Sequence, residues 1–175
     1  NDIWGLRTPE WGWNAPLAQL VAQRGVPIVL MHNRRAQATV GALGGHYRDV
    51  RYSDLLGEIV AELREAVAFA EAQGIARARI IADPGIGFGK TPAQNLELVR
   101  RLAELRALDL PLLVGASRKS FIGLPLNLPP AERDEGTAAV TALAIAAGAD
   151  IVRVHNVQMN VRAARITDAI LRTAG

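Results

Sequence analysis

The residues of this 175-residue chain that could carry out chemistry gather in five short clusters, each at the end of a predicted strand. Apolar runs such as Pro27–His32 and Arg79–Asp83 are rich in branched side chains, which is typical of strands buried on both faces. Ligands of parallel α/β proteins bind at the carboxyl ends of the strands. The sequence therefore predicts one site, built from Asn1-Asp2, Met31-His32-Asn33, Asp83-Pro84-Gly85, Gly115 to Ser120 and Arg153 to Asn156.

Asp83 is the acidic candidate, because it ends an apolar strand and a buried carboxylate needs hydrogen-bond donors. One interpretation is a ligand that presents two adjacent N–H groups, as the edge of a guanidine-like heterocycle does. The other is structural: an Asx turn before Pro84 or a bond to Lys119. The residue alone leaves both open.

The glycine-rich segment Gly85 to Thr91 resembles a phosphate-binding loop, but the first glycine of that motif would fall at Pro84. We therefore expect the glycines to let the backbone approach a ligand, while Phe88 presents a flat aromatic face.

The cationic candidates lie after two later strands. In Ser117-Arg118-Lys119-Ser120, Lys119 could donate to a carbonyl or ring nitrogen and Ser120 could bond a substrate, although a solvated basic loop is the alternative. Arg153 and His155 are two residues apart on a strand, so their side chains share a face and would suit a phosphate or pyrophosphate. For His155 the alternative is a core histidine bonded to backbone.

Strands and helices alternate along the chain, which predicts a single α/β domain over residues 1–175 with parallel strands and right-handed crossovers. Helices are expected from Asn14 to about Gly25, over 53–73, from Thr91 onward, over 134–147 and over 157–173. The helix from Thr91 is expected to place Leu96, Val99, Leu102 and Leu105 on one stripe. A short helix is expected near 119–123 and a polar loop over 33–52. The strands are expected at 1–6, 27–32, 79–83, 111–115 and 150–155. These five units form either an open sheet or part of a (β/α)₈ barrel, which needs about 250 residues.

Composition excludes several classes of protein. Half of the residues are hydrophobic and 21% are charged, which excludes a disordered tail. The apolar runs are too short to span a membrane. A net charge of +3 from scattered basic residues does not indicate nucleic-acid binding. There is no cysteine, which removes thiol chemistry, and residues 1–7 lack the layout of a signal peptide, so a cytoplasmic protein is expected.

Three motifs in order resemble the dihydropteroate synthase family over essentially the whole chain: 83–91 (DPGIGFGKT), 117–123 (SRKSFIG) and 135–137 (EGT) with 153–155 (RVH). The resemblance implies a (β/α)₈ barrel whose first strands are absent. It also implies condensation of 6-hydroxymethyl-7,8-dihydropterin pyrophosphate with p-aminobenzoate, using Mg²⁺, and a homodimer.

By motif, the resemblance implies that Asn1, Asp83 and Lys119 contact the pterin, with Met31 and Gly115 lining that part of the site. Phe88 and Ser120 would shape the p-aminobenzoate pocket. Arg153, with His155 and Asn1, would hold the pyrophosphate. Lys119, Asp83 and Arg153 are expected to carry the catalysis, and the family's metal-binding Asn falls outside this sequence.

The sequence departs from the family at 33–36 (NRRA, where Met-Arg-Gly is usual) and at Asn156, where Asp is common. Two other interpretations remain open. One is a pterin-binding methyltransferase domain, which has no need for the Ser-Arg-Lys-Ser loop or for the pair Arg153 and His155. The other is a non-catalytic fragment of the synthase.

Overall fold

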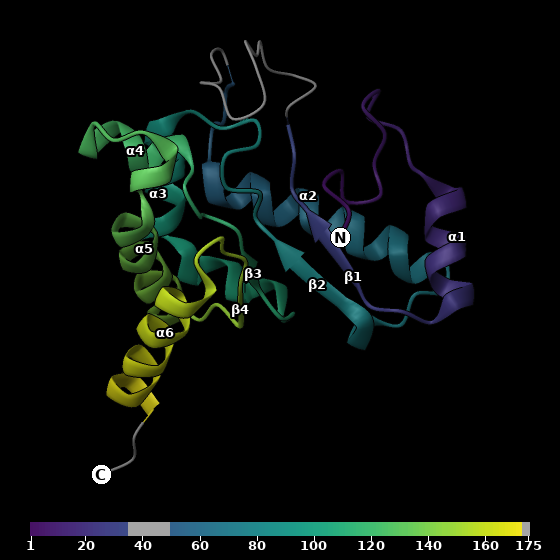
Figure 1. Cartoon of the computed structure of the whole chain (residues 1–175). Coiled ribbons are helices and arrows are strands. Elements are labelled where there is room, and N and C mark those ends of the chain that lie inside the picture. Colours follow the sequence, from purple (N-terminus) through teal and green to yellow (C-terminus); the bar gives the residue numbers. More distant parts are fainter. Residues whose placement is uncertain (35–49, 173–175) are drawn as a thin grey trace.

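The computed structural model describes residues 1–34 and 50–172, in which short parallel strands alternate with helices (Figure 1). In chain order these are α1 (Ala15–Arg24), β1 (Ile28–Met31), α2 (Leu55–Ala72), β2 (Ile80–Asp83), α3 (Pro92–Arg100), β3 (Leu113–Val114), α4 (Ser120–Leu126), α5 (Asp134–Ala146), β4 (Ile151–Val152) and α6 (Val157–Arg172). Single 3₁₀ segments lie at Arg77–Arg79, Leu102–Leu108 and Pro130–Glu132. The expected α/β class is confirmed.

The strands run parallel and lie in chain order. β1 pairs with β2 from Ile28 opposite Ile80 to Met31 opposite Asp83. β3 pairs with β4, and a single bridge between Ala82 and Leu112 joins the two pairs. A further parallel bridge, from Asp2 to Leu30, places the N-terminus beside β1. This order brings all five carboxyl-end clusters to one edge.

Local sequence signals explain where the helices begin and end. The Asn14 side chain accepts from the Leu17 amide at 3.1 Å at the start of α1, and Gly25 ends the helix in the left-handed conformation with φ +60°. Thr91 and Gln94 form a reciprocal capping box at the start of α3. These caps fix the connections that lead into and away from β1 and β2.

Helix α2 lies against the sheet and contributes to both parts of the core (Figure 1). Its apolar positions are buried as the helical spacing predicts, with Ile59 and Leu63 at 0% and 1% exposure. One part of the core lies among α2, α3, β2 and β3, and the other among α1, β1, β2 and the second half of α2. Among the described residues, no helix is long and apolar enough to cross a bilayer.

Three sequence-based expectations on element boundaries are wrong. The segment at 1–6 pairs only through Asp2, and the strand expected at 150–155 pairs only at Ile151–Val152. The helix from Thr91 stops at Arg100 and continues as a 3₁₀ segment. The expected stripe is wrong at Leu96, which is 48% exposed, because the buried face of α3 is formed by Asn95, Leu98 and Val99 and Leu96 lies on the other side of the helix. The loop expected at 33–52 lies mostly outside the described residues.

The contrast between these two leucines gives a stability prediction. Leu98→Ala is expected to lower the free energy of unfolding by about 2–5 kcal/mol, because it removes buried apolar contacts and leaves a cavity. Leu96→Ala deletes the same atoms from the surface of the same helix and is the matched control, with an expected change within about 0.5 kcal/mol. Urea denaturation measures both, and equal losses would contradict the packing described here.

Candidate active site

Asp83, the last residue of β2, is the buried acid at the centre of the site. Its side chain is 1% exposed, and its neighbour across the sheet, Met31, is buried to the same extent. Oδ1 accepts the backbone N–H of Gly85 at 2.8 Å, and Oδ2 lies 3.0 Å from Nη2 of Arg153. The Asx-type turn is therefore present together with an ion pair. An ionised carboxylate has about four acceptor positions, so Asp83 keeps capacity for a ligand.

Arg153 connects this buried acid to the surface. Its Nη1 donates to Oδ1 of Asn1 at 2.7 Å, and its side chain remains 43% exposed. Gly115, at the end of β3, makes room for it, since a Cβ there would lie 2.7 Å from Nη2 of Arg153. The structure thus brings together residues that are 152 positions apart in sequence, with a cation whose exposed part can face an anionic ligand.

Lys119 lies beside this cluster, at the start of α4. Its ammonium donates to the carbonyl of Ile86 and lies 4.7 Å from the centroid of the Phe88 ring. Burial lowers the pKa of Lys119 to about 8; Arg153 also lowers it and Asp83 opposes the shift. Gly87 leaves space for the lysine stem, because a Cβ there would lie 2.9 Å from Cδ of Lys119. The glycine at 87 therefore accommodates a protein side chain, and Lys119 is a half-buried cation over an aromatic face.

His155 is exposed, so the alternative of a core histidine is wrong. Its Nδ1 lies 2.8 Å from Oγ of Ser117, and the same oxygen accepts the His155 backbone N–H at 3.1 Å. The Ser117 hydroxyl thus fixes the position of the His155 ring through its Nδ1 edge.

Arg118 does not join the other cations. Its guanidinium forms a bidentate ion pair with Asp134, at 2.8 and 3.0 Å. Asn156 donates to the same carboxylate at 3.0 Å. An Asp at 156 would set a second carboxylate against Asp134, so the departure from the family at this position suits the local charges.

Ser120, the first residue of α4, borders a surface hollow of about 480 Å³. The hollow lies between α4 and the turn that follows it, and it is mixed in polarity. Its other lining residues are Gly123, Leu124, Asn127, Leu128, Pro129, Pro130 and Arg133. The hollow is large enough for a small aromatic molecule.

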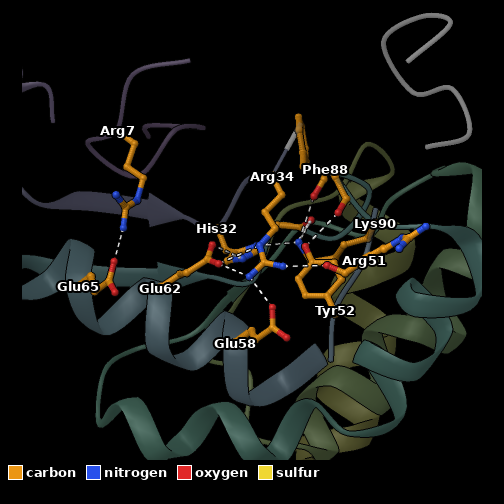
Figure 2. Close-up of polar contacts among 12 residues, drawn as sticks. Arg7, His32, Arg34, Arg51, Tyr52, Glu58, Glu62, Glu65, Phe88 and Lys90 are labelled. Carbon is orange, nitrogen blue, oxygen red and sulfur yellow. Dashed lines mark hydrogen bonds and ion pairs between the residues drawn. The ribbon is translucent and has the colours of Figure 1, made fainter. Parts of the chain in front are cut away.

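The sequence did not indicate a role for Lys90 or for the His32 ring. Figure 2 shows Lys90 between His32 and Phe88 in a chain of polar contacts that continues from His32 to Glu62. Nζ of Lys90 lies 2.9 Å from Nδ1 of His32, and His32 Nε2 lies 3.0 Å from Oε2 of Glu62. Burial lowers the pKa of His32 to about 4 and that of Lys90 to about 7. The sequence held one signal for Lys90: it and Lys119 are the only lysines among 20 basic residues.

Mg²⁺, which the resemblance implies, finds no ligand set here. No three His, Asp or Glu side chains converge in the part of the chain that the structure describes. The acceptor oxygen of Asn1 and one oxygen of Asp83 are directed at Arg153. The described residues therefore do not fit a magnesium site.

The comparisons with known proteins identify the family of the chain. The family of pterin binding enzymes matches residues 1–155. The dihydropteroate synthase of Bacillus subtilis is 42% identical over 175 residues, which are 100% of this chain and 55% of that protein. That of Clostridium beijerinckii is 43% identical over 98% of this chain and 58% of its own length.

Solved structures give the same result. The dihydropteroate synthase of Clostridium difficile, in the presence of pteroic acid, has a TM-score of 0.84 at 39% identity and covers 99% of this chain and 59% of its own. That of Xanthomonas albilineans with 4-aminobenzoic acid has a TM-score of 0.83 at 35% identity, with 99% of this chain and 57% of its own covered. The chain thus spans a little more than half the length of these relatives. On the match over residues 1–155, the chain belongs to the pterin binding enzyme family.

Proposed function

We propose that this chain provides most of the active site of a dihydropteroate synthase, which joins 6-hydroxymethyl-7,8-dihydropterin pyrophosphate to p-aminobenzoate. The observation that carries the proposal is the placement of a buried acid, Asp83, 3.0 Å from a half-exposed cation, Arg153, with Lys119 beside them. The named relatives and the pteroic acid and 4-aminobenzoic acid complexes of similar structures support it.

The reaction breaks the C–O bond between the pterin methylene and the diphosphate and forms a C–N bond to the arylamine, which loses one proton. The diphosphate leaves with the bonding electron pair, so the protein needs to stabilise that anion and needs no nucleophile of its own. Arg153 and the His155 ring are placed to do so. The remaining acceptor positions of Asp83 would bind the N–H edge of the pterin and favour positive charge on it.

Lys119 and Phe88 would form the border between the two substrates. The ammonium of Lys119 is directed at the Ile86 carbonyl and lies over the Phe88 ring, so it can reach a pterin heteroatom while the ring supports the arylamine. Ser120 would line the p-aminobenzoate side next to the hollow at α4. The arylamine is weakly basic, so it is already an uncharged nucleophile at neutral pH.

The test supplies both substrates and Mg²⁺ and measures dihydropteroate and pyrophosphate in equal amounts. It is run on the chain itself and on the chain joined to the residues that the B. subtilis relative has beyond the matched part. Product from the joined form supports the proposal. If the joined form binds both substrates and makes no product, the synthase assignment fails and a binding-only protein takes its place.

The barrel, the homodimer and the cytoplasmic location belong to the same proposal. The parallel order of β1 to β4 supports a (β/α)₈ barrel that closes with further strands. Helix α6 exposes Val157, Val161, Ile166 and Ile170, which supports association with a second copy. Sedimentation of the joined form at several concentrations tests the dimer, and a concentration-independent monomer would contradict it.

A further inference from the structure

Lys90 has the bonding pattern of a buried ammonium ion whose three protons are all used. Its side chain is 1% exposed, and Nζ lies 3.1 Å from the Gly85 carbonyl, 3.1 Å from the Phe88 carbonyl and 2.9 Å from Nδ1 of His32. An ammonium has three donors, and these three acceptors match them one for one. The neutral amine has only two N–H donors, so its lone pair would have to accept a hydrogen bond from Nδ1–H of His32 instead.

The neighbours of His32 decide between the two forms. When Lys90 donates to Nδ1, the proton of neutral His32 sits on Nε2, 3.0 Å from a carboxylate oxygen of Glu62. The opposite tautomer would set a bare ring nitrogen against that carboxylate. Glu62 is in turn bonded by Arg34, which also pairs with Glu58 at 2.6 Å. The ammonium form thus avoids setting a lone pair against the Glu62 carboxylate, which lies within ion-pair distance of Nε2 without forming a hydrogen bond to it.

The two carbonyls that Lys90 holds lie at either end of the segment that bears the aromatic face of the site. Between them, the Ile86 carbonyl accepts the ammonium of Lys119. The buried side of the segment is therefore bonded to Lys90 and its active-site side to Lys119. At Gly85 the backbone of the segment lies close to the backbone of His32. Its φ is +67°, and a Cβ there would lie 1.8 Å from the His32 carbonyl oxygen, so the position requires glycine.

The choice of residue type supports a specific role. Of the 20 basic residues only two are lysines, and both bind this segment. An ammonium is compact and directs three donors from one atom, whereas the planar guanidinium of arginine needs more space and a different arrangement of acceptors. The position at 90 is fully enclosed, so a lysine fits there and an arginine does not.

We propose that Lys90 is a positioning residue, which holds the segment 84–89 from its buried side and thereby sets the positions of Phe88 and Lys119. The inference rests on the proposed function, because it assigns those two residues to the substrates. Asp83 depends less on Lys90, since the pairing of β2 with β1 and the ion pair with Arg153 hold it independently.

The first variant is Lys90→Met, which keeps the length of the side chain and removes its three donors. We expect kcat/KM for p-aminobenzoate to fall about ten- to a hundredfold, because small displacements of positioning groups are costly. Affinity for the pterin, measured by calorimetry with the unreactive 6-hydroxymethyl pterin, should change less than about threefold. Arg101→Met is the matched control and should leave both values unchanged, since Arg101 pairs with Glu97, Glu104 and Asp54, which have no part in the proposed site.

The second variant, Lys90→Met/His32→Leu, separates positioning from folding. Removing both partners of a buried polar pair restores part of the stability lost when one is removed. Thermal stability should therefore recover in part, while kcat/KM stays low because the Gly85 and Phe88 carbonyls still lack their donor. If activity recovers together with stability, Lys90 acts only through folding and the proposal is overturned.

Hydrogen exchange gives a measurement that needs no turnover. In the double variant the amides of Gly87 and Phe88 should exchange at least tenfold faster than in the unmodified chain, with α2 unchanged. Unchanged exchange at these amides would overturn the proposal whatever the activity. An inactive joined form without substitutions, by contrast, would count against the proposed function alone, since the exchange result stands without it.

Discussion

Arg153→Met is expected to lower kcat/KM for the pterin pyrophosphate about a thousandfold, or about 4 kcal/mol of transition-state stabilisation. The substitution removes the cation that lies between the buried Asp83 and the exposed Asn1. The anion that leaves in the proposed reaction then has no guanidinium to stabilise it, and Asp83 keeps a buried charge without its partner. Initial rates at saturating p-aminobenzoate measure the loss.

Two further measurements identify the reason for that loss. Affinity for inorganic pyrophosphate should fall more than affinity for 6-hydroxymethyl pterin, which lacks the diphosphate. The kcat/KM of Arg153→Lys should lie between that of the unmodified protein and that of the Met variant. One ammonium cannot bond Asp83 and Asn1 together in the way that the two nitrogens of the guanidinium do. Arg101→Met serves as the control for loss of a basic residue. A rate near that of the unmodified protein in Arg153→Met would remove Arg153 from the reaction.

Most of the helices and strands could be predicted from local signals. Asn14 with Pro16 and Thr91 with Pro92 mark helix starts, because a capping side chain and a following proline satisfy or remove the free N–H groups of the first turn. The apolar runs that become β1 and β2 predict buried strands, because a strand of a parallel sheet that helices cover has apolar residues on both faces. Parallel order then follows from the alternation itself.

The main acid and cations of the candidate site could also be located, because the carboxyl ends of parallel strands share one edge. That rule places Asp83, Arg153 and Asn1 in one region before any coordinates are known. It does not show which donor meets which acceptor. Arg118 and Lys119 are adjacent in sequence, yet one pairs with Asp134 and the other points at Ile86.

The remaining features depend on contacts between segments far apart in the chain. The role of Lys90 needs the His32 ring, 58 positions earlier, and Glu62 from α2. The exposure of Leu96 follows from the rotation of α3 about its axis, which buries Asn95, Leu98 and Val99 and is set by the elements packed against the helix. Such outcomes are set by packing, which overrides the local period.

Lys119→Met is expected to lower kcat about a thousandfold, because the ammonium contacts both the glycine-rich segment and the Phe88 ring. Lys119→Arg keeps the charge and should retain more activity than the Met variant. Circular dichroism and thermal unfolding confirm that each variant is folded. Equal rates in Lys119→Met and the unmodified protein would contradict a role for this residue.

The pH dependence separates the charge of Lys119 from its packing. Below a pKa of about 8 the side chain is an ammonium, so kcat should fall as the pH rises through about 8, after an earlier step at about 7 where the positioning ammonium of Lys90 is lost. Lysine-selective NMR gives only two side-chain signals, and Lys119→Arg removes one of them, which assigns the titrations expected at about 7 for Lys90 and about 8 for Lys119.

Loss of activity in this range is not loss of fold. Burial places the pKa of Lys119 below its ordinary value of 10.5, so between about 8 and 10.5 the unfolded chain holds the proton that the folded chain has released. The contribution of Lys119 to the stability of the fold therefore increases with pH over the same range in which its charge is lost. An activity that declines above pH 8 while the urea midpoint holds or rises would assign the decline to the ammonium itself. A midpoint that falls in step with the activity would assign it to unfolding.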